Sequence, residues 1–279
     1  MSYKTILVHL DEAMLAKERL STAAEIALAH DAHLVGSAII GRHTFNFQQA
    51  RIEEKDPALA KHIDFLIGRA QHYVDAFDEA MRKMCVPSFE GRVVDGEANY
   101  ALSLQAHYCD LVIISQAFSE KHHHVLLPDF SEFVLLHAGC PVLMLPKEWR
   151  HPTIGKRVLI AWNGSSKATR AINDAIPMLK RAEQVQIAVF NVQSNVDLPR
   201  NSAGHDIACS MARHDVNVEV LPPRKTPDVG MGLLAMAEEL SCDLLVMGGY
   251  GHSRLREKLL GGVTQTILRK MNLPVLMSH

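Results

Sequence analysis

The sequence predicts an α/β protein made of two tandem open domains, each with a five-stranded parallel sheet. Three observations lead to this fold class. The chain has 279 residues, which suits two small domains better than one. Strand-like segments of the first half recur in the second half. Short apolar runs rich in Val, Ile and Leu alternate with longer segments of helical periodicity, as in βαβ units covered on both faces.

The internal repeat is visible at fixed offsets. Ile6–Asp11 recurs as Val158–Asn163, at an offset of 158 − 6 = 152. Asp110–Ser115 recurs as Asp243–Gly248, at an offset of 243 − 110 = 133. The later offset also relates Cys140–Leu145 to Leu273–Ser278. The chain therefore contains one structural unit twice.

The difference between the offsets, 152 − 133 = 19, indicates that the first half carries about 19 extra residues between its first and fourth strands. We place them around Phe45 to Arg69, where a polar stretch interrupts the pattern, and expect an extra helix or a lid there.

The elements follow in chain order. Strands of the first half are predicted at Thr5–Leu10, His33–Ile40, Ser88–Val94, Leu111–Ser115 and Pro141–Leu145. Strands of the second half are predicted at Arg157–Trp162, Val185–Val192, Val216–Leu221, Leu244–Gly248 and Pro274–Met277. Helices of the second half are predicted at Lys167–Arg181, Gly204–His214, Gly230–Leu240 and Val263–Met271.

The boundary between the halves is a polar stretch with two prolines and a glycine, Pro146–Gly155, which is typical of a linker. The predicted division is a first domain at 1–147, a linker at 148–155 and a second domain at 156–279.

Composition excludes several classes of protein. The formal net charge is −2, which gives no basic excess for nucleic acid or an anionic membrane. The five cysteines are scattered without a C-x-x-C pair, which is typical of reduced thiols in a cytoplasmic protein. No apolar run is long enough for a membrane span, and the first residues do not resemble a signal peptide.

The glycines after the fourth strand of the second half mark a candidate ligand site. Ligands of open parallel sheets bind outside the carboxyl ends of the strands. Gly248–Arg254 follows that strand, and Gly261–Thr264 opens the last helix. Glycine lets the backbone approach a ligand closely, and a helix N-terminus favours a phosphate. The alternative is that these glycines serve as plain turns.

These residues resemble the ATP-binding signature of the universal stress protein family, and the chain is similar to the tandem form of that family over nearly its whole length. The signature has a glycine, two residues, a glycine, nine residues, a glycine and then Ser or Thr. Gly248, Gly251 and Gly261 match its three glycines. Gly262 stands where the family often has a hydroxyl, and the hydroxyl is displaced to Thr264.

The resemblance implies further contacts. The family holds adenine and ribose near an Asp after the first strand, where this second half has Asn163. Ala161, Trp162 and Val192 are expected to line the adenine pocket, with packing near the linker as the alternative for Trp162. The expected nucleotide-binding residues are Ala161, Trp162, Asn163, Val192, Gly248, Gly251, His252, Arg254, Gly261, Gly262, Val263 and Thr264.

The first half departs from the signature. It keeps the Asp as Asp11, but Gly248, Gly251, Gly261 and Gly262 face Ser115, Phe118, Pro128 and Asp129. A proline removes one N–H and a carboxylate stands where a phosphate would lie. We expect that this half does not bind ATP in the usual way.

Other motifs in the sequence do not predict a metal site or a catalytic site. His122–His124 are consecutive, and adjacent side chains rarely converge on one ion, so a solvated loop is expected and no metal site is predicted. His252 and Ser253 are too close in sequence for a nucleophile and base, and Arg254 is better suited to a phosphate or a partner. The chain has no P-loop motif and no dinucleotide fingerprint, and no catalytic residue is assigned.

The resemblance therefore implies a cytoplasmic stress-response protein that binds ATP, with or without Mg²⁺, in its second domain and acts as a regulator or sensor. It also implies two Rossmann-like domains packed as an internal pseudo-dimer through Val142–Leu145 and Val275–Met277, with a further homodimer possible and no nucleic acid or membrane partner. Two alternatives stay open. One is a scaffold or binding protein for a ligand other than a nucleotide, and the other is a slow ATPase.

Overall fold

The computed structural model describes residues 2–11, 16–41, 57–116, 130–147, 149, 153–191, 204–250 and 262–279. The chain divides into two compact units. The N-terminal unit comprises Tyr3–Cys140, and the C-terminal unit comprises Pro141–His279 together with Met1–Ser2.

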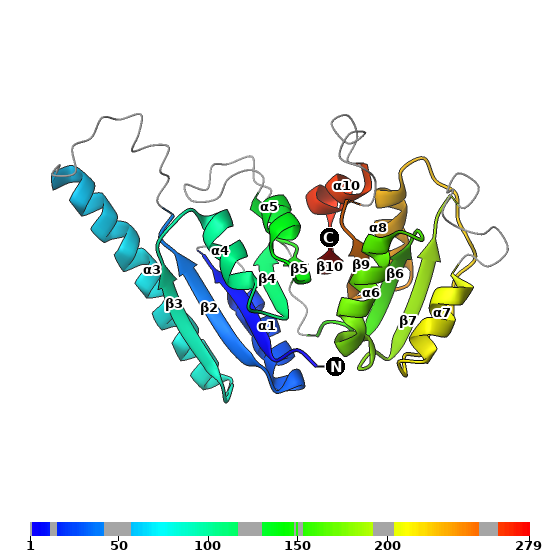
Figure 1. Ribbon diagram of the computed structural model, residues 1–279, viewed down its shortest axis with the longest axis horizontal. Coiled ribbons are helices and arrows are strands. Elements are labelled where there is room, and N and C mark those ends of the chain that lie inside the picture. Colours follow the sequence, from blue (N-terminus) through cyan, green and yellow to red (C-terminus); the bar gives the residue numbers. More distant parts are fainter. Residues whose placement is uncertain are drawn as a thin grey trace. The chain divides into compact units, whose positions relative to one another are not determined.

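The N-terminal unit is a parallel sheet with the strand order β3-β2-β1-β4 and connecting helices (Figure 1). Its strands are β1 (Thr5–Leu10), β2 (His33–Ile39), β3 (Phe89–Val94) and β4 (Leu111–Ser115). Its helices are α1 (Ala16–His30), α3 (Pro57–Lys83), α4 (Ala98–Ala106) and α5 (Phe130–His137). The central strands β1 and β4 are almost wholly buried, which is why they read as continuous apolar runs.

The C-terminal unit has the strand order β5-β10-β9-β6-β7-β8. Its strands are β5 (Val142–Leu145), β6 (Arg157–Trp162), β7 (Gln184–Val189), β8 (Glu219–Val220), β9 (Leu244–Gly248) and β10 (Val275–Ser278). Its helices are α6 (Ser166–Leu179), α7 (His205–Ala212), α8 (Val229–Glu239) and α10 (Gly262–Lys270). All neighbouring strands are parallel except β5 and β10, which are antiparallel with Leu143 opposite Leu276.

The predicted parallel α/β class is confirmed. The pairing of β5 with β10 groups β5 with the second half of the chain. The division into repeats at 1–147 and 156–279, and the packing of these repeats as a pseudo-dimer, stay predictions.

The extra length of the first half lies partly in α3. This helix has 27 residues and its counterpart α7 has 8, a difference of 27 − 8 = 19. Part of the segment predicted as an extra helix or lid, 57–69, is the first half of α3, and the remainder, 45–56, lies outside the described residues. In Figure 1, α3 runs beside β3, and its inner face is formed by Leu66, Ala70, Val74, Phe77 and Met81.

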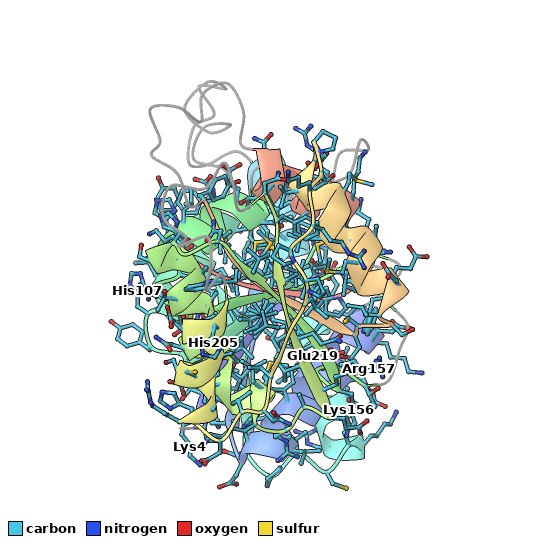
Figure 2. All side chains as sticks on the ribbon, turned by 90° about the vertical axis from the view of Figure 1, so that its right-hand side faces the viewer. Lys4, His107, Lys156, Arg157, His205 and Glu219 are labelled. Carbon is cyan, nitrogen blue, oxygen red and sulfur yellow. The ribbon has the colours of Figure 1, made fainter. Side chains whose placement is uncertain are left out.

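A repeated carboxylate fixes the start of the first strand in each unit. In the C-terminal unit, Asp243 accepts hydrogen bonds from the backbone N–H groups of Gly155, Lys156 and Arg157, at 3.1, 3.0 and 2.9 Å. Asp110 accepts from two backbone N–H groups at the start of β1, at 2.7 and 2.9 Å. Figure 2 labels Lys156 and Arg157, which lie at the end of β6 opposite to the carboxyl end. These carboxylates therefore have a structural role at the start of the sheet.

Candidate functional site

The turn after β6 organises one side of the candidate site in the C-terminal unit. The side-chain oxygen of Asn163 accepts a hydrogen bond from the backbone N–H of Ser165 at 3.1 Å. Gly164 in between has φ 78°, a left-handed conformation that suits glycine. Ser165 then caps α6, because its hydroxyl accepts from the N–H of Ala168 at 3.2 Å. Asn163 therefore stabilises the turn after β6, and it also lies at the predicted ligand position.

Gly248, at the end of β9, lies directly against the start of α6. A Cβ added to Gly248 would come within 2.6 Å of both the carbonyl carbon of Lys167 and the nitrogen of Ala168. The absence of a side chain here is a packing requirement inside the protein. Packing against α6 thus explains why residue 248 is a glycine, independently of the ATP-binding signature.

The segment after β9 is tied to the last helix and the last strand. The backbone N–H of Tyr250 donates to the hydroxyl of Thr264 at 3.2 Å, and Thr264 is only 6% exposed. The N–H of Gly249 donates to the carbonyl of Ser278 at 2.9 Å. The displaced hydroxyl of the signature therefore holds the backbone at Tyr250, just after β9.

The N-terminus of α10 lies at Gly262, which is exposed and would accept a Cβ with no heavy atom within 4 Å. Val263 beside it is half-buried. The first N–H groups of a helix have no partner within the helix and carry its positive dipole end. An anion fits this end of α10 by its electrostatics.

The segment after β7 is clamped to the segment after β8. The side-chain nitrogen of Asn191 donates to the carbonyl of Thr226 at 2.9 Å, and the side-chain oxygen accepts from the N–H of Thr226 at 3.0 Å. Asn191 has φ 54°, so the chain turns sharply there. This clamp was not predicted, because Asn191 lies inside the strand predicted at Val185–Val192, whereas β7 ends at Val189 and Asn191 belongs to the turn after it.

The structure places Ala161 and Trp162 at the end of β6, Asn163 directly after it and Gly248 at the end of β9. Gly262, Val263 and Thr264 form the first turn of α10. Ala161 and Trp162 are half-buried at the end of β6, and neither interpretation of Trp162 is tested. Outside the described residues lie Val192, Gly251, His252, Arg254, Gly261 and the run His122–His124. The described residues contain no group of three or more His, Cys, Asp or Glu side chains able to hold a metal ion.

The N-terminal unit carries an ionic cluster at the corresponding place. The guanidinium of Arg19 donates from Nη2 to Asp11 Oδ1 at 2.6 Å and from Nη1 to the hydroxyl of Ser115 at 2.6 Å. His9 Nδ1 lies 3.4 Å from Asp11 Oδ2, and its ring packs on that of Phe130 with centroids 5.0 Å apart. We call His9, Asp11, Arg19 and Ser115 the Arg19 cluster.

The pKa of Asp11 reflects this environment. Burial alone raises the pKa of this carboxyl, but Arg19 and His9 stabilise the ionised form more strongly and hold its pKa well below the ordinary value. The side chain of Arg19 is 1% exposed and that of Asp11 is 21% exposed. Asp11 is therefore an ionised partner of a buried guanidinium.

The repeat relates the Arg19 cluster to the candidate site residue by residue. The 152-residue offset continues into α1 and α6, because positions 19, 20, 23, 24, 26 and 27 of α1 and their counterparts in α6 are all buried. It places Arg19 opposite Ala171, both of them buried. The cluster members His9, Asp11, Arg19 and Ser115 have the counterparts Ala161, Asn163, Ala171 and Gly248, and Phe130, which packs on His9, has the counterpart Val263. No C-terminal counterpart has a larger or charged side chain, so this unit has less side-chain volume and no formal charge at these positions.

Sequence reasoning missed Arg19 and Ala171. Arg19 lies in α1, and an arginine on a helix is ordinarily exposed. The signal was present in the repeat, since the 152-residue offset sets Arg19 opposite a small apolar residue.

The two units thus define an open, mostly parallel, Rossmann-like α/β protein with its candidate site at the carboxyl ends of the strands. A sequence model of the universal stress protein family matches residues 211–279. Universal stress protein Slr1230 of Synechocystis sp. is 26% identical over 138 residues, which are 49% of this chain and 46% of that protein. Universal stress protein MJ0577 of Methanocaldococcus jannaschii is 41% identical over 44 residues, which are 16% of this chain and 27% of that protein. The chain thus spans less than half the length of each curated relative.

Solved structures extend the comparison to the whole chain. A universal stress protein from Archaeoglobus fulgidus has a TM-score of 0.70 at 16% identity, over 98% of this chain and 97% of that one. A protein of Pseudomonas aeruginosa described as functionally unknown has a TM-score of 0.60 at 18% identity, over 99% and 92%. At these identities the likeness concerns the fold. Together with the sequence matches, it confirms the resemblance to the universal stress protein family.

Proposed function

We propose that the C-terminal unit binds an adenine nucleotide, ATP, and that the protein uses this binding as a regulator or sensor in a stress response. The observation that carries the proposal is the exposed N-terminus of α10 at Gly262, where Thr264 is hydrogen-bonded to Tyr250 just after β9, together with the uncharged side chains of Ala161 and Asn163 at the end of β6. A triphosphate needs close backbone approach and N–H donors, and this arrangement supplies both. The family resemblance supplies the identity of the base.

The residues present fit a nucleotide in distinct ways. The N–H groups at the start of α10, from Gly262 onward, are suited to phosphate oxygens. Asn163 can donate and accept hydrogen bonds at the position of the family's Asp, without its charge. Thr264 holds the backbone at Tyr250 through its hydroxyl. Mg²⁺ would be held largely by phosphate oxygens and water, its usual ligands beside a nucleotide.

The proposed role is nucleotide binding without an assigned hydrolysis step. Catalysis at a phosphate needs a positioned base or water-orienting group. The described part of the candidate site offers Asn163, Thr264 and the backbone, none of which is a base at neutral pH. A binding and signalling role therefore accounts for these residues better than turnover does. We place this role in the cytoplasm, since the scattered cysteines suit a reducing compartment.

The test is the nucleotide content of the purified protein. Protein prepared without added ligand is denatured, and the released small molecules are measured by chromatography and mass spectrometry. We expect adenine nucleotide approaching one equivalent per chain, and a rise in Tm when ATP is added to stripped protein. Protein that releases none and shows no thermal shift with ATP would instead favour the scaffold interpretation.

Repeat-matched variants locate the site. Gly251→Val is expected to abolish ATP binding, whereas Phe118→Val, at the equivalent position of the first half, is expected to leave it unchanged. Loss of binding in both variants would indicate a global effect, and loss only in Phe118→Val would place the site in the N-terminal unit. Linear ATP turnover that Gly251→Val abolishes would support the ATPase alternative.

A further inference from the structure

We propose that Arg19 acts as a built-in ligand of the N-terminal unit: its guanidinium fills a site for a small planar cation formed by Asp11 and Ser115 and makes this unit independent of nucleotide. The inference does not depend on what the C-terminal unit binds.

The geometry of the guanidinium supports the first claim, that Arg19 fills a site for a planar cation. Arg19 bridges the end of β1, through Asp11, to the end of β4, through Ser115, with both short contacts at 2.6 Å. Nη1 lies 3.4 Å from the second carboxylate oxygen of Asp11. The two terminal nitrogens of a guanidinium can make such contacts at once because they form a rigid planar fork. A point charge such as an ammonium cannot reproduce this pattern.

The internal repeat supports the second claim, that the N-terminal unit is independent of nucleotide. Ala171 occupies the position of Arg19 in the C-terminal unit, and Asn163 and Gly248 occupy those of its two partners. The two charges are thus lost at the positions of Asp11 and Arg19, and side-chain volume is lost at the positions of Arg19 and Ser115. The pattern is expected if one unit supplies its own occupant and the other accepts one from solution.

Arg19 itself occupies the space that a ligand of the N-terminal site would need. With Arg19 in place, a wholly buried side chain takes the space beside Asp11. If Arg19 were removed, Asp11 would remain as an anion beside Ser115 and His9. The emptied site would therefore be complementary to a guanidinium.

Chemical rescue tests the proposal in the full-length protein. Arg19→Ala removes the atoms that ethylguanidinium contains and should lower the Tm by about 10 °C, because the variant leaves a buried carboxylate without its cation. Millimolar ethylguanidinium should raise the Tm of this variant and leave the wild type unchanged. Ethylammonium, which lacks the fork, and urea, which lacks the charge, should not raise it.

Two matched variants make the rescue specific. Arg82→Ala removes an arginine that pairs with Asp78 but whose side chain is 71% exposed. The Tm of this variant should not respond to ethylguanidinium. The double variant Asp11→Asn with Arg19→Ala removes the acceptor charge and should also show none. An equal response in either control, or an equal effect of ethylammonium, would overturn the proposal.

A second measurement covers the case in which Arg19→Ala does not fold. In the wild type, NMR should show guanidinium protons of Arg19 that exchange with solvent far more slowly than those of the exposed Arg82. If the guanidinium protons of Arg19 exchanged as fast as those of Arg82, a buried guanidinium with hydrogen bonds to Asp11 and Ser115 would be contradicted. A second equivalent of nucleotide bound by the wild-type protein would also refute the proposal, because the N-terminal unit would then take a nucleotide with Arg19 in place.

Discussion

Gly248 at the end of β9 lies so close to Ala168 in the first turn of α6 that a Cβ on Gly248 would approach the Ala168 backbone nitrogen to 2.6 Å. The neighbouring atoms are backbone and cannot rotate away. The first glycine of the signature thus has a structural role that is separate from any ligand.

Gly248→Ala should therefore destabilise the protein by about 2 kcal/mol, the usual scale of overpacking. Gly262→Ala is the matched control, because a Cβ there meets nothing within 4 Å, and it should change stability by less than about 0.5 kcal/mol. Urea denaturation followed by circular dichroism measures both. Equal stability of the two variants would show that β9 and α6 can separate without cost.

The ion pair of Asp11 and Arg19 predicts a pH dependence. Since the pKa of Asp11 in the folded protein lies below its unfolded value of about 3.9, the pair stabilises the fold above that pH and the stabilisation is lost as pH falls through the folded pKa. Asp11→Asn should cost about 3–5 kcal/mol at pH 7, and the difference from wild type should shrink below about pH 5.

Denaturation in urea at a series of pH values from 7 to acid checks this expectation. Asp31→Asn is the control, because Asp31 is 92% exposed and should show a small difference at every pH. A cost of Asp11→Asn that stays constant down to acid pH would contradict the assigned ion pair.

The carboxylate of Asp243 should matter more than any exposed ion pair. Asp243→Ala removes the acceptor of three backbone N–H groups before and at the start of β6, and we expect a loss of about 2 kcal/mol or more. Asp243→Asn keeps one oxygen acceptor and should lose less. Glu183→Ala, which removes the exposed partner of Lys156, should be nearly neutral. Thermal unfolding ranks the three variants, and a neutral Asp243→Ala would refute the bracing role.

Two equivalent cysteines should resist alkylation. Burial raises the pKa of Cys109 and of Cys242 to about 11, so about 0.1% of either thiol is ionised at pH 8. Cys85 and Cys209 are exposed and should react first with iodoacetamide in the folded protein. Peptide mass spectrometry over time gives the order, and reaction of all four at one rate would contradict it. In urea the difference should disappear.

The sequence by itself determined the repeat, the parallel α/β class and the bounds of most strands. Thr5–Leu10, Arg157–Trp162 and Leu244–Gly248 are predicted to the residue, because a strand buried on both faces must be apolar along its whole length and this is a local property. The signature after β9 and the displaced hydroxyl at Thr264 were visible for the same reason. Such features depend on neighbours in sequence.

The tertiary structure decided the features that join distant segments. Arg19 contacts Ser115, which is 96 residues away, and Gly248 is fixed by the approach of α6. Asn191 and Thr226 clamp two loops together, and Thr264 holds Tyr250. Hydrophobic periodicity reports which face of an element is buried, but it does not report what lies against that face. Whether an arginine is solvated or buried against a carboxylate is therefore settled only when the chain has folded.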